Sequence, residues 1–431
     1  MQKKIFCFIF LILIFSTLPF SFAQQNNNFE SEFNFDNKIF FLIFNFTLLF
    51  LILLIIKNKI PNNLKKIIQN IFSFDLSKKN TQIILCVIFS LYIISVINEL
   101  DDVENLFGDS IAVTKHAENF TNLYIENFDL DHLFTVIPSP NYVLLSTSIQ
   151  LFDNIKIIPF IGSLFLIFVT YILTKEITKK RFAGIISILV ILQSPLFLKY
   201  DTIATYTNFW MLFYLISLYL IIKRWQFSVL SYLISLFTKP LTILFLPISI
   251  SFIYNALITK KEKYFSYFAY LVIIIVGVIV YSSGSYVPTI EQFNYNEFLS
   301  GLKQFSSFMK DDLFIIVAIL PLTVGLFIIS RRGNQYANSI QVMIGVIFLS
   351  FPLIIALTPQ NNHDYRMIPI VIAFALGIGT LFSNTSIEQI KKSKKVISIL
   401  VFIFTFSIVG INIISVIFPG IIQGTYQVQL G

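Results

Sequence analysis

The chain has 431 residues, of which 56% are hydrophobic and 13% are charged, with 49 phenylalanines and a formal net charge of +8 at pH 7. A water-soluble fold cannot bury so much apolar surface, so the composition excludes soluble domains and indicates a polytopic membrane protein. In lipid, every backbone polar group must be paired within the protein, which favours helices over strands. The sequence therefore predicts an all-α bundle of transmembrane helices.

The N-terminus has the features of a secretory signal. Lys3 and Lys4 precede the apolar run IFCFIFLILIFSTLPF, which ends in the small-residue pattern of residues 21–23. This order is typical of a signal peptide cleaved after Ala23, and retention as an uncleaved first helix is the alternative. A polar tail, a first span and a basic loop then occupy 24–80, and the main membrane domain occupies 81–431.

Twelve apolar runs follow the signal, and each is a predicted membrane span. They lie at 39–57, 81–98, 157–174, 182–198, 208–222, 226–238, 240–258, 265–283, 313–330, 338–357, 367–384 and 396–417. When the loops are assigned alternately to two sides, one side holds 21 lysines and arginines against four acids. The other side, without the N-terminal tail, holds seven basic residues and sixteen acids. Because Lys and Arg beside spans are retained in the cytoplasm, the basic side is predicted to be cytoplasmic and the protein to lie in the plasma membrane.

The stretch Thr238-Lys239-Pro240 divides two of these runs, and 226–258 is alternatively one long segment. A single crossing would place the lysines of 260–263 outside and invert every later basic loop. The charge pattern therefore favours two spans, with a break at Lys239.

The outer loop 99–156 is much longer than a connector requires, and it is predicted to be a functional loop with short juxtamembrane helices. It carries ten acids between Glu99 and Asp153 but only two basic residues. Asp101, Asp102 and Glu104 follow the preceding span directly, and their hard oxygens suit a divalent cation such as magnesium, calcium or manganese. His116 and His132 lie on the same loop without the ligand spacing of a zinc site.

Other ionisable groups lie at helix ends on the same predicted side: Lys199, Asp201, Lys239, and the segment PQNNHDYRMIP at 359–369 with His363, Tyr365 and Arg366. A lysine with almost no loop to solvate it is costly near a bilayer unless it snorkels, pairs with an acid or faces a cavity. A guanidinium can hold a phosphate through two donors, or it can pair with Asp364. Cations and carboxylates on one side suit group transfer from a lipid phosphate.

The order of these motifs resembles the polytopic C-type glycosyltransferases that use polyprenyl-phosphate sugars, such as protein O-mannosyltransferases and the aminoarabinose and rhizobial core-sugar transferases. The resemblance is carried by GDSIAVTKHAEN, in which Asp109 precedes Ala117 by eight residues, and by the later segments IPSPNYVLL, SPLFLKYDTIATYTNFW, LFTKPLTILFLP and HDYRMIPIVIA. Together these segments extend over most of the chain from about residue 80 onward. Ser110 stands where the family often has a second acid, so the resemblance leaves the sugar and the acceptor undefined.

The resemblance implies a fold, a donor and a set of roles. Asp109 falls on the family's catalytic aspartate, the base that activates an acceptor hydroxyl. Lys239 and Arg366 fall where contacts with the lipid phosphate are expected, and Lys199, Asp201, His363 and Tyr365 are further candidates for that site. The donor is a polyprenyl-phosphate sugar, and the acceptor is a protein, a lipid or a glycan, with no role for nucleic acid.

Alternatives remain open at this level. Asp101 with Asp102 is a competing position for the base, and a solvated loop without a catalytic role is another. The chain as a whole is alternatively a transporter or flippase of lipid-linked sugars, although we find no internal repeat of the kind that transporters often have. It is also alternatively a non-catalytic assembly protein with the same fold, since fold does not fix function.

Overall fold

The computed structural model describes residues 70, 72–102, 112–119, 140–282, 292–309, 312–357, 364–383 and 392–417. Within these residues the chain is all helical and contains no strand. The chain divides into two compact units. Unit 1 is drawn from Met1–Asp75, Ile177–Lys199 and Glu291–Gly431, and unit 2 from Leu76–Glu176 and Tyr200–Ile290.

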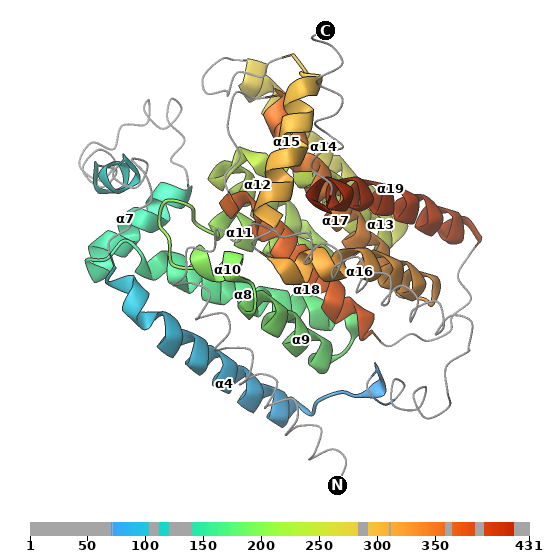
Figure 1. Ribbon diagram of the computed structural model, residues 1–431, viewed down its shortest axis with the longest axis horizontal. Helices are drawn as coiled ribbons and strands as arrows, with labels where there is room; N and C mark the ends of the chain where they lie inside the picture. Colours follow the sequence, from blue (N-terminus) through green and yellow to red (C-terminus); the bar gives the residue numbers. More distant parts are fainter. Residues whose placement is uncertain are drawn as a thin grey trace. The chain divides into compact units, whose positions relative to one another are not determined.

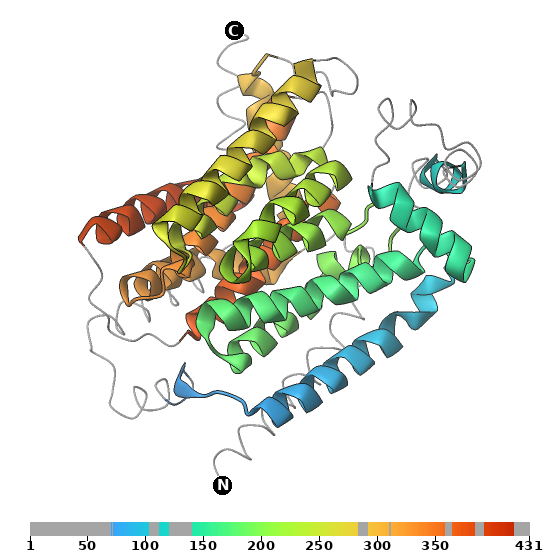
Figure 2. The ribbon, with the colours of Figure 1, turned by 180° about the vertical axis from the view of Figure 1, so that it is seen from behind.

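Unit 2 begins with α4 and the short 3-10 helix η1, continues through a helical segment at 112–119 and ends with α14. Its elements are α4 (Lys78–Val96), η1 (Ile97–Leu100), α7 (Pro140–Phe152), α8 (Ile157–Thr178, whose last two residues fall in unit 1), α11 (Phe209–Lys223), η2 (Trp225–Phe227), α12 (Ser228–Thr238), η3 (Pro240–Phe245), α13 (Leu246–Asn255) and α14 (Lys260–Ser282). Helix α4 runs beside α8, and α11 packs against α12 and α13 (Figures 1 and 2).

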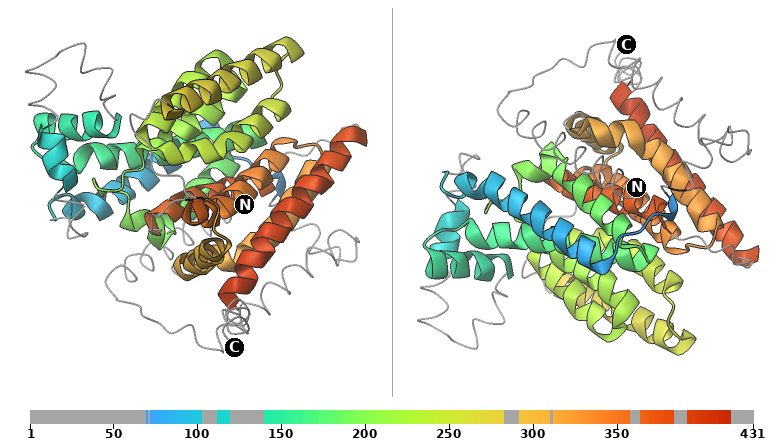
Figure 3. Two further views of the ribbon diagram at one scale, coloured as in Figure 1. Left: turned by 90° about the horizontal axis from the view of Figure 1, so that it is seen from above. Right: turned by 90° about the horizontal axis from the view of Figure 1, so that it is seen from below.

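Unit 1 is a bundle around the almost fully buried helix α18. Its elements are α9 (Arg181–Leu192), α10 (Pro195–Lys199), α15 (Tyr295–Met309), α16 (Leu313–Arg331), α17 (Tyr336–Leu357), η4 (Asp364–Met367), α18 (Ile368–Leu381) and α19 (Lys392–Ile417). Helix α18 packs against α9, α16 and α17, and α19 crosses α16 and α17 (Figures 1 and 3). Helix α15 lies along α17 and α19 and also contacts η4.

Five helical stretches are long and apolar enough to cross a bilayer among the residues searched: Lys78–Leu100, Ile157–Thr178, Tyr336–Leu357, Asp364–Leu381 and Val396–Ile413. A stretch of 22 residues in an α-helix is about 33 Å long, which matches the roughly 30 Å hydrocarbon core of a bilayer. Five shorter apolar helices accompany them: Arg181–Leu192, Phe209–Lys223, Trp225–Thr238, Pro240–Asn255 and Ala318–Arg331. The prediction of an all-helical chain is therefore confirmed for the described residues, and five helical stretches have the length and composition of membrane spans, whereas the number of spans remains a prediction.

Most predicted spans coincide with helices, but one expectation is wrong. The run 182–198 was expected to form one helix, and the chain instead forms α9 and α10 with a break at Ser194. Pro195 explains the break, because proline has no N–H to donate and disfavours the helical conformation of the residue before it.

The predicted break at Lys239 is confirmed, since α12 ends at Thr238 and Lys239 is extended, with φ −150° and ψ 112°. The predicted signal and first span lie outside the described residues.

Two helices begin at a side chain that pairs an exposed backbone N–H group. Ser77 begins α4, where its hydroxyl accepts a hydrogen bond from the N–H of Asn80 at 3.2 Å. Asp312 begins α16, where one carboxyl oxygen accepts from the N–H of Ile315 at 3.3 Å. Helix α15 lies in a segment for which the sequence predicted no membrane span. Its 15 residues are amphipathic rather than continuously apolar, so a search for apolar runs does not find it.

Glycine permits one especially close contact in unit 1. A Cβ atom at Gly301 of α15 would lie 2.8 Å from the Cα of Pro352 in α17, so the two helices could not keep this separation with any other residue. Gly410 of α19 has no atom within 4 Å of its own Cβ position. The two glycines form a matched pair for testing the packing of α15.

We expect Gly301→Ala to lower the free energy of unfolding by about 1–3 kcal/mol, because the added methyl overpacks a backbone contact. Gly410→Ala should be neutral or stabilising by up to about 1 kcal/mol, because alanine restricts the unfolded chain and meets no neighbour. Thermal unfolding of both variants in detergent measures the difference. Equal midpoints for the two variants would contradict the packing of α15 on α17.

Candidate functional site

A buried aspartate lies in the turn that leads into α11 of unit 2. Asp201 is 1% exposed, and the hydroxyl of Tyr92 in α4 donates a hydrogen bond to its Oδ2 at 2.5 Å. The hydroxyl of Ser163 in α8 donates to the backbone carbonyl of Asp201 at 2.7 Å. The other carboxyl oxygen, Oδ1, is buried and accepts no hydrogen bond within the part of the chain that the structure describes.

The other end of this turn is held by an amide side chain. The Nδ2 of Asn208 donates to Ser163 Oγ at 3.2 Å and to the carbonyl of Tyr200 at 3.1 Å. The residues 200–208 are therefore tied to α4, α8 and the start of α11 by three side chains from different helices. We name the group Tyr92, Ser163, Asp201 and Asn208 the Asp201 turn.

Burial raises the pKa of the Asp201 carboxyl well above its usual range, since a charged carboxylate loses its water there. The hydrogen bond from Tyr92 and the neighbouring backbone amides lower the pKa, and the negative charge of Glu99 raises it. The desolvation of the carboxyl is the largest of these effects. Asp201 therefore keeps its proton to a higher pH than an exposed aspartate does, and a protonated carboxyl can donate a hydrogen bond.

The acids that follow α4 differ from Asp201 in exposure. Asp101 and Asp102 are exposed at the end of η1, and Glu104 lies outside the described residues. The end of η1 is fixed by its own neighbours, because Lys156 Nζ donates to the carbonyl of Glu99 at 2.8 Å and Asn154 Nδ2 to the carbonyl of Leu100 at 3.0 Å. No group of three or more metal-ligating side chains was found within the described ranges.

The helical segment 112–119 packs beside the Asp201 turn through Ala117. In the helical segment 112–119, Ala117 is fully buried against Leu145 of α7 and against Ala204, three residues after Asp201. The ring of His116 lies 5.9 Å from that of Tyr142 of α7, measured between centroids. The predicted base Asp109 lies outside the described residues, as does His132. The segment that follows Asp109 in sequence is therefore fastened beside the Asp201 turn.

Lys239 projects from the break between α12 and η3 toward an aromatic ring. Its ammonium lies 5.3 Å from the ring centroid of Trp210, a distance at which a cation–π attraction operates. The Trp210 ring stacks in turn on Phe245, with 5.7 Å between centroids. Trp210 lies two residues after Asn208, so the first turn of α11 positions both Lys239 and the Asp201 turn.

Unit 1 gathers a second polar group, which we name the Arg366 cluster: Ser194, Lys199, Asp312, Asp364, Tyr365 and Arg366. Lys199 Nζ forms an ion pair with Asp364 Oδ2 at 2.5 Å. Arg366 is buried, its Nε donates to the Tyr365 hydroxyl at 3.3 Å, and its guanidinium lies 5.8 Å from the centre of that ring. The sequence left open an ion pair between Arg366 and Asp364. In the structure the ion pair of Asp364 is with Lys199, whose side chain is 50% exposed.

The break between α9 and α10 also belongs to this cluster. The Ser194 hydroxyl donates to Asp312 Oδ2 at 2.6 Å, and both side chains are buried. Helix α10 contacts η4 and α18, which brings Lys199 to Asp364. The predicted residue His363 lies outside the described residues.

The structure thus brings several of the predicted site residues together in two groups, and it places further residues in each group that the sequence did not indicate. Lys199, Tyr365 and Arg366 come together in unit 1, whereas Asp201 and Lys239 are both held by the start of α11 in unit 2. Sequence reasoning missed Tyr92, Ser163, Asn208 and Trp210. Their only signal was a polar or aromatic side chain inside or beside an apolar run, and such residues are common in any membrane helix.

Comparison of the chain with protein-family models, with curated proteins and with solved structures gives no match.

We expect Asp201→Asn to stabilise the protein relative to the native chain increasingly as the pH rises from about 4 to 8. In the unfolded chain the aspartate loses its proton above a pH of about 3.9. The folded protein holds that proton longer because its pKa is raised, so the native chain loses stability over this range and the asparagine variant does not. Thermal unfolding in detergent across this pH range measures the difference.

Tyr92→Phe provides the comparison for this prediction. Removing the phenol takes away a hydrogen bond that lowers the pKa of Asp201, so the loss of stability with rising pH should continue to a higher pH than in the native chain. A stability difference between Asp201→Asn and the native chain that does not change with pH would show that the folded carboxyl ionises normally.

Proposed function

We propose that the chain is an integral membrane glycosyltransferase of the C-type, which moves one sugar from a polyprenyl-phosphate donor to an acceptor on the outer face of the plasma membrane. The observation that carries the proposal is the ordered series of charged motifs at helix ends. The acidic loop follows η1, Lys199 ends α10, Lys239 follows α12 and Asp364 begins η4. Reactive groups at helix ends meet the interface, where lipid head groups lie.

The proposed topology has twelve spans after a cleaved signal, with the basic loops in the cytoplasm. In this topology the Asp201 turn, Lys239, the Arg366 cluster and the outer loop 99–156 all belong to the extracytoplasmic side. The support for this arrangement is the distribution of lysine and arginine over successive loops.

The proposed reaction is a direct displacement at the anomeric carbon. The acceptor hydroxyl oxygen attacks that carbon as the bond from it to the phosphate oxygen breaks, and the configuration inverts. The carboxylate of Asp109 takes the hydroxyl proton, and the departing polyprenyl phosphate keeps the electron pair. Asp101 and Asp102 are exposed enough to hold a divalent cation, which would neutralise charge on the leaving phosphate.

The cations are proposed to stabilise the negative charge that grows on the leaving phosphate. Within unit 1, Arg366 can present two parallel N–H donors to a phosphate and Lys199 a single charge, and Lys239 of unit 2 is a separate candidate. Tyr365 and His363, which precede the arginine in the sequence, are the candidate hydroxyl and imidazole donors. Asp201, when protonated, is neutral and can donate a hydrogen bond to a phosphate oxygen without like-charge repulsion.

Asp109→Asn should lower the rate of sugar transfer by about 10²–10⁴, because a general base contributes that much and asparagine cannot accept the proton. The assay supplies purified protein in detergent with a panel of radiolabelled hexosyl and pentosyl polyprenyl phosphates and follows the release of polyprenyl phosphate. Asp153→Asn is the matched control, since Asp153 is exposed on the same loop and its backbone is left-handed, at φ 53°, which asparagine tolerates. Full transfer by the Asp109 variant would remove this residue from the mechanism.

Arg366→Lys should raise the KM for the donor by roughly tenfold, because lysine keeps the charge but loses the planar pair of donors. The turnover number should fall as well, because the arginine is proposed to stabilise the charge that grows on the leaving phosphate in the transition state. Steady-state kinetics with varied donor measure both constants, and a thermal-unfolding curve of the variant checks that the buried site still folds. An unchanged donor KM would exclude Arg366 from the phosphate site.

The transporter and the assembly protein remain the alternatives to this enzyme. Transfer of sugar in detergent, where no compartments exist, separates a transferase from a transporter or flippase. Mass spectrometry of cell-surface glycans and lipid-linked sugars, with and without the protein, identifies the donor and acceptor through the sugar that is lost.

A further inference from the structure

One end of unit 2 carries a group of basic and aromatic side chains that the proposed reaction does not use. Lys223 at the end of α11 forms an ion pair with Glu176 of α8 at 2.7 Å. Trp225 of η2 donates from its indole Nε1 to Glu262 Oε1 of α14 at 3.2 Å. These two contacts join the ends of α8 and α11 and the start of α14 into one surface.

The two carboxylates at this surface are occupied by local partners. Glu262 Oε2 accepts hydrogen bonds from the N–H and the hydroxyl of Thr259, at 2.8 and 2.9 Å, which is the capping box that begins α14. Glu176 is paired with Lys223. The acids therefore stabilise the fold, and neither forms an ion pair with Arg224, Lys260 or Lys261 in the part of the chain that the structure describes.

Three basic side chains remain exposed at the same place: Arg224, Lys260 and Lys261. Arg224 and Lys260 have no ion-pair partner among the residues that the structure describes. The Lys261 ammonium lies 5.9 Å from the ring centroid of Phe265, four residues further along α14. The Phe265 ring also lies nearly parallel to Trp225, with 6.5 Å between centroids.

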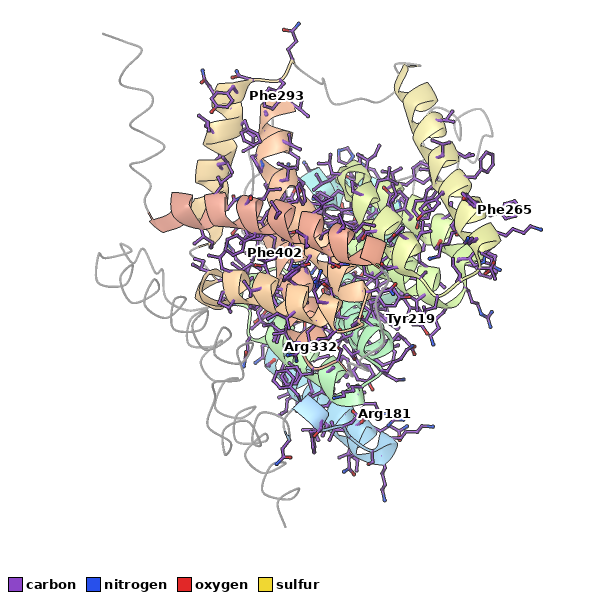
Figure 4. All side chains as sticks on the ribbon, turned by 90° about the vertical axis from the view of Figure 1, so that its right-hand side faces the viewer. Arg181, Tyr219, Phe265, Phe293, Arg332 and Phe402 are labelled. Carbon is purple, nitrogen blue, oxygen red and sulfur yellow. The ribbon has the colours of Figure 1, made fainter. Side chains whose placement is uncertain are left out.

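An exposed apolar stripe begins at this group and runs along α14. Its members repeat at helical spacing: Tyr264, Phe265, Phe268, Leu271, Val272 and Ile275. Tyr264 is 72% exposed and Phe268 63%, and Figure 4 shows Phe265 at the outer margin of α14. Phe265 and Ile275 are ten positions apart, which is about 15 Å along an α-helix and half of a hydrocarbon core of about 30 Å.

We infer that this surface binds an anionic phospholipid, with the phosphate between Arg224, Lys260 and Lys261 and the acyl chains along the α14 stripe. The exposed cations match the charge of such a head group, and the stripe matches the length of one leaflet. The Trp225 and Tyr264 rings lie at the junction of the two, where amphipathic aromatic rings reside in membranes. The inference does not depend on the proposed reaction.

Native mass spectrometry of the full chain in detergent tests this site with phosphatidylglycerol and, separately, phosphatidylcholine. The native chain should retain phosphatidylglycerol at least about tenfold more tightly than phosphatidylcholine. The variant R224Q/K260Q/K261Q should lose this preference, with phosphatidylglycerol affinity falling on the order of 100-fold for three juxtamembrane charges. Phe268→Ser should weaken both lipids and leave the preference intact.

The matched control K78Q/K79Q/R332Q removes three exposed charges elsewhere in the chain and should keep the native preference. An equal loss in the control would show that net charge alone attracts the lipid, which overturns the site. Equal affinity of the native chain for both lipids would also overturn it. Glycerol phosphate, which lacks acyl chains, should not displace the bound lipid, and displacement would show a site for the free anion instead.

Discussion

A bilayer contains no water to pair with backbone N–H and C=O groups, and this constraint governs the whole structure. The backbone groups in the middle of a membrane helix are all paired within the helix, whereas those at its ends are unpaired and can bind other groups. In this chain the polar side chains that attract attention lie where helices stop: at Ser194, at Asp201, at Lys239 and at Asp364. The breaks between helices are therefore the positions at which this chain places polar side chains that could bind a ligand.

Each break is fixed by a different local cause, and buried partners bind the polar groups at Ser194, Asp201 and Lys239. Pro195 interrupts α9, and the freed Ser194 hydroxyl binds the carboxylate that begins α16. Pro240 follows Lys239, whose charge is placed over the Trp210 ring. A polar group buried without a partner is costly, so partners from distant segments are recruited to these positions.

The sequence was sufficient to predict an all-helical fold and most helix positions, because continuous apolar runs are local signals. The break at Lys239 followed from the charges of its neighbouring loops. The division of 182–198 into α9 and α10 was missed because hydrophobicity alone does not register the geometric effect of Pro195. The pairings Tyr92 with Asp201 and Lys199 with Asp364 could not be predicted, since nothing local specifies which helix ends will meet. Asp109, chosen from a resemblance, remains a prediction.

The bond between Tyr92 and Asp201 joins residues that are 109 positions apart in the chain. A ribosome adds roughly 5–20 residues each second, so α4 enters the membrane on the order of 5–20 s before its partner is made. During that interval the phenol and the hydroxyl of Ser163 have no Asp201 to bind. The ends of α4 and α8 that bind Asp201 therefore acquire their final spacing late in biosynthesis, once the residues that lead into α11 have been made.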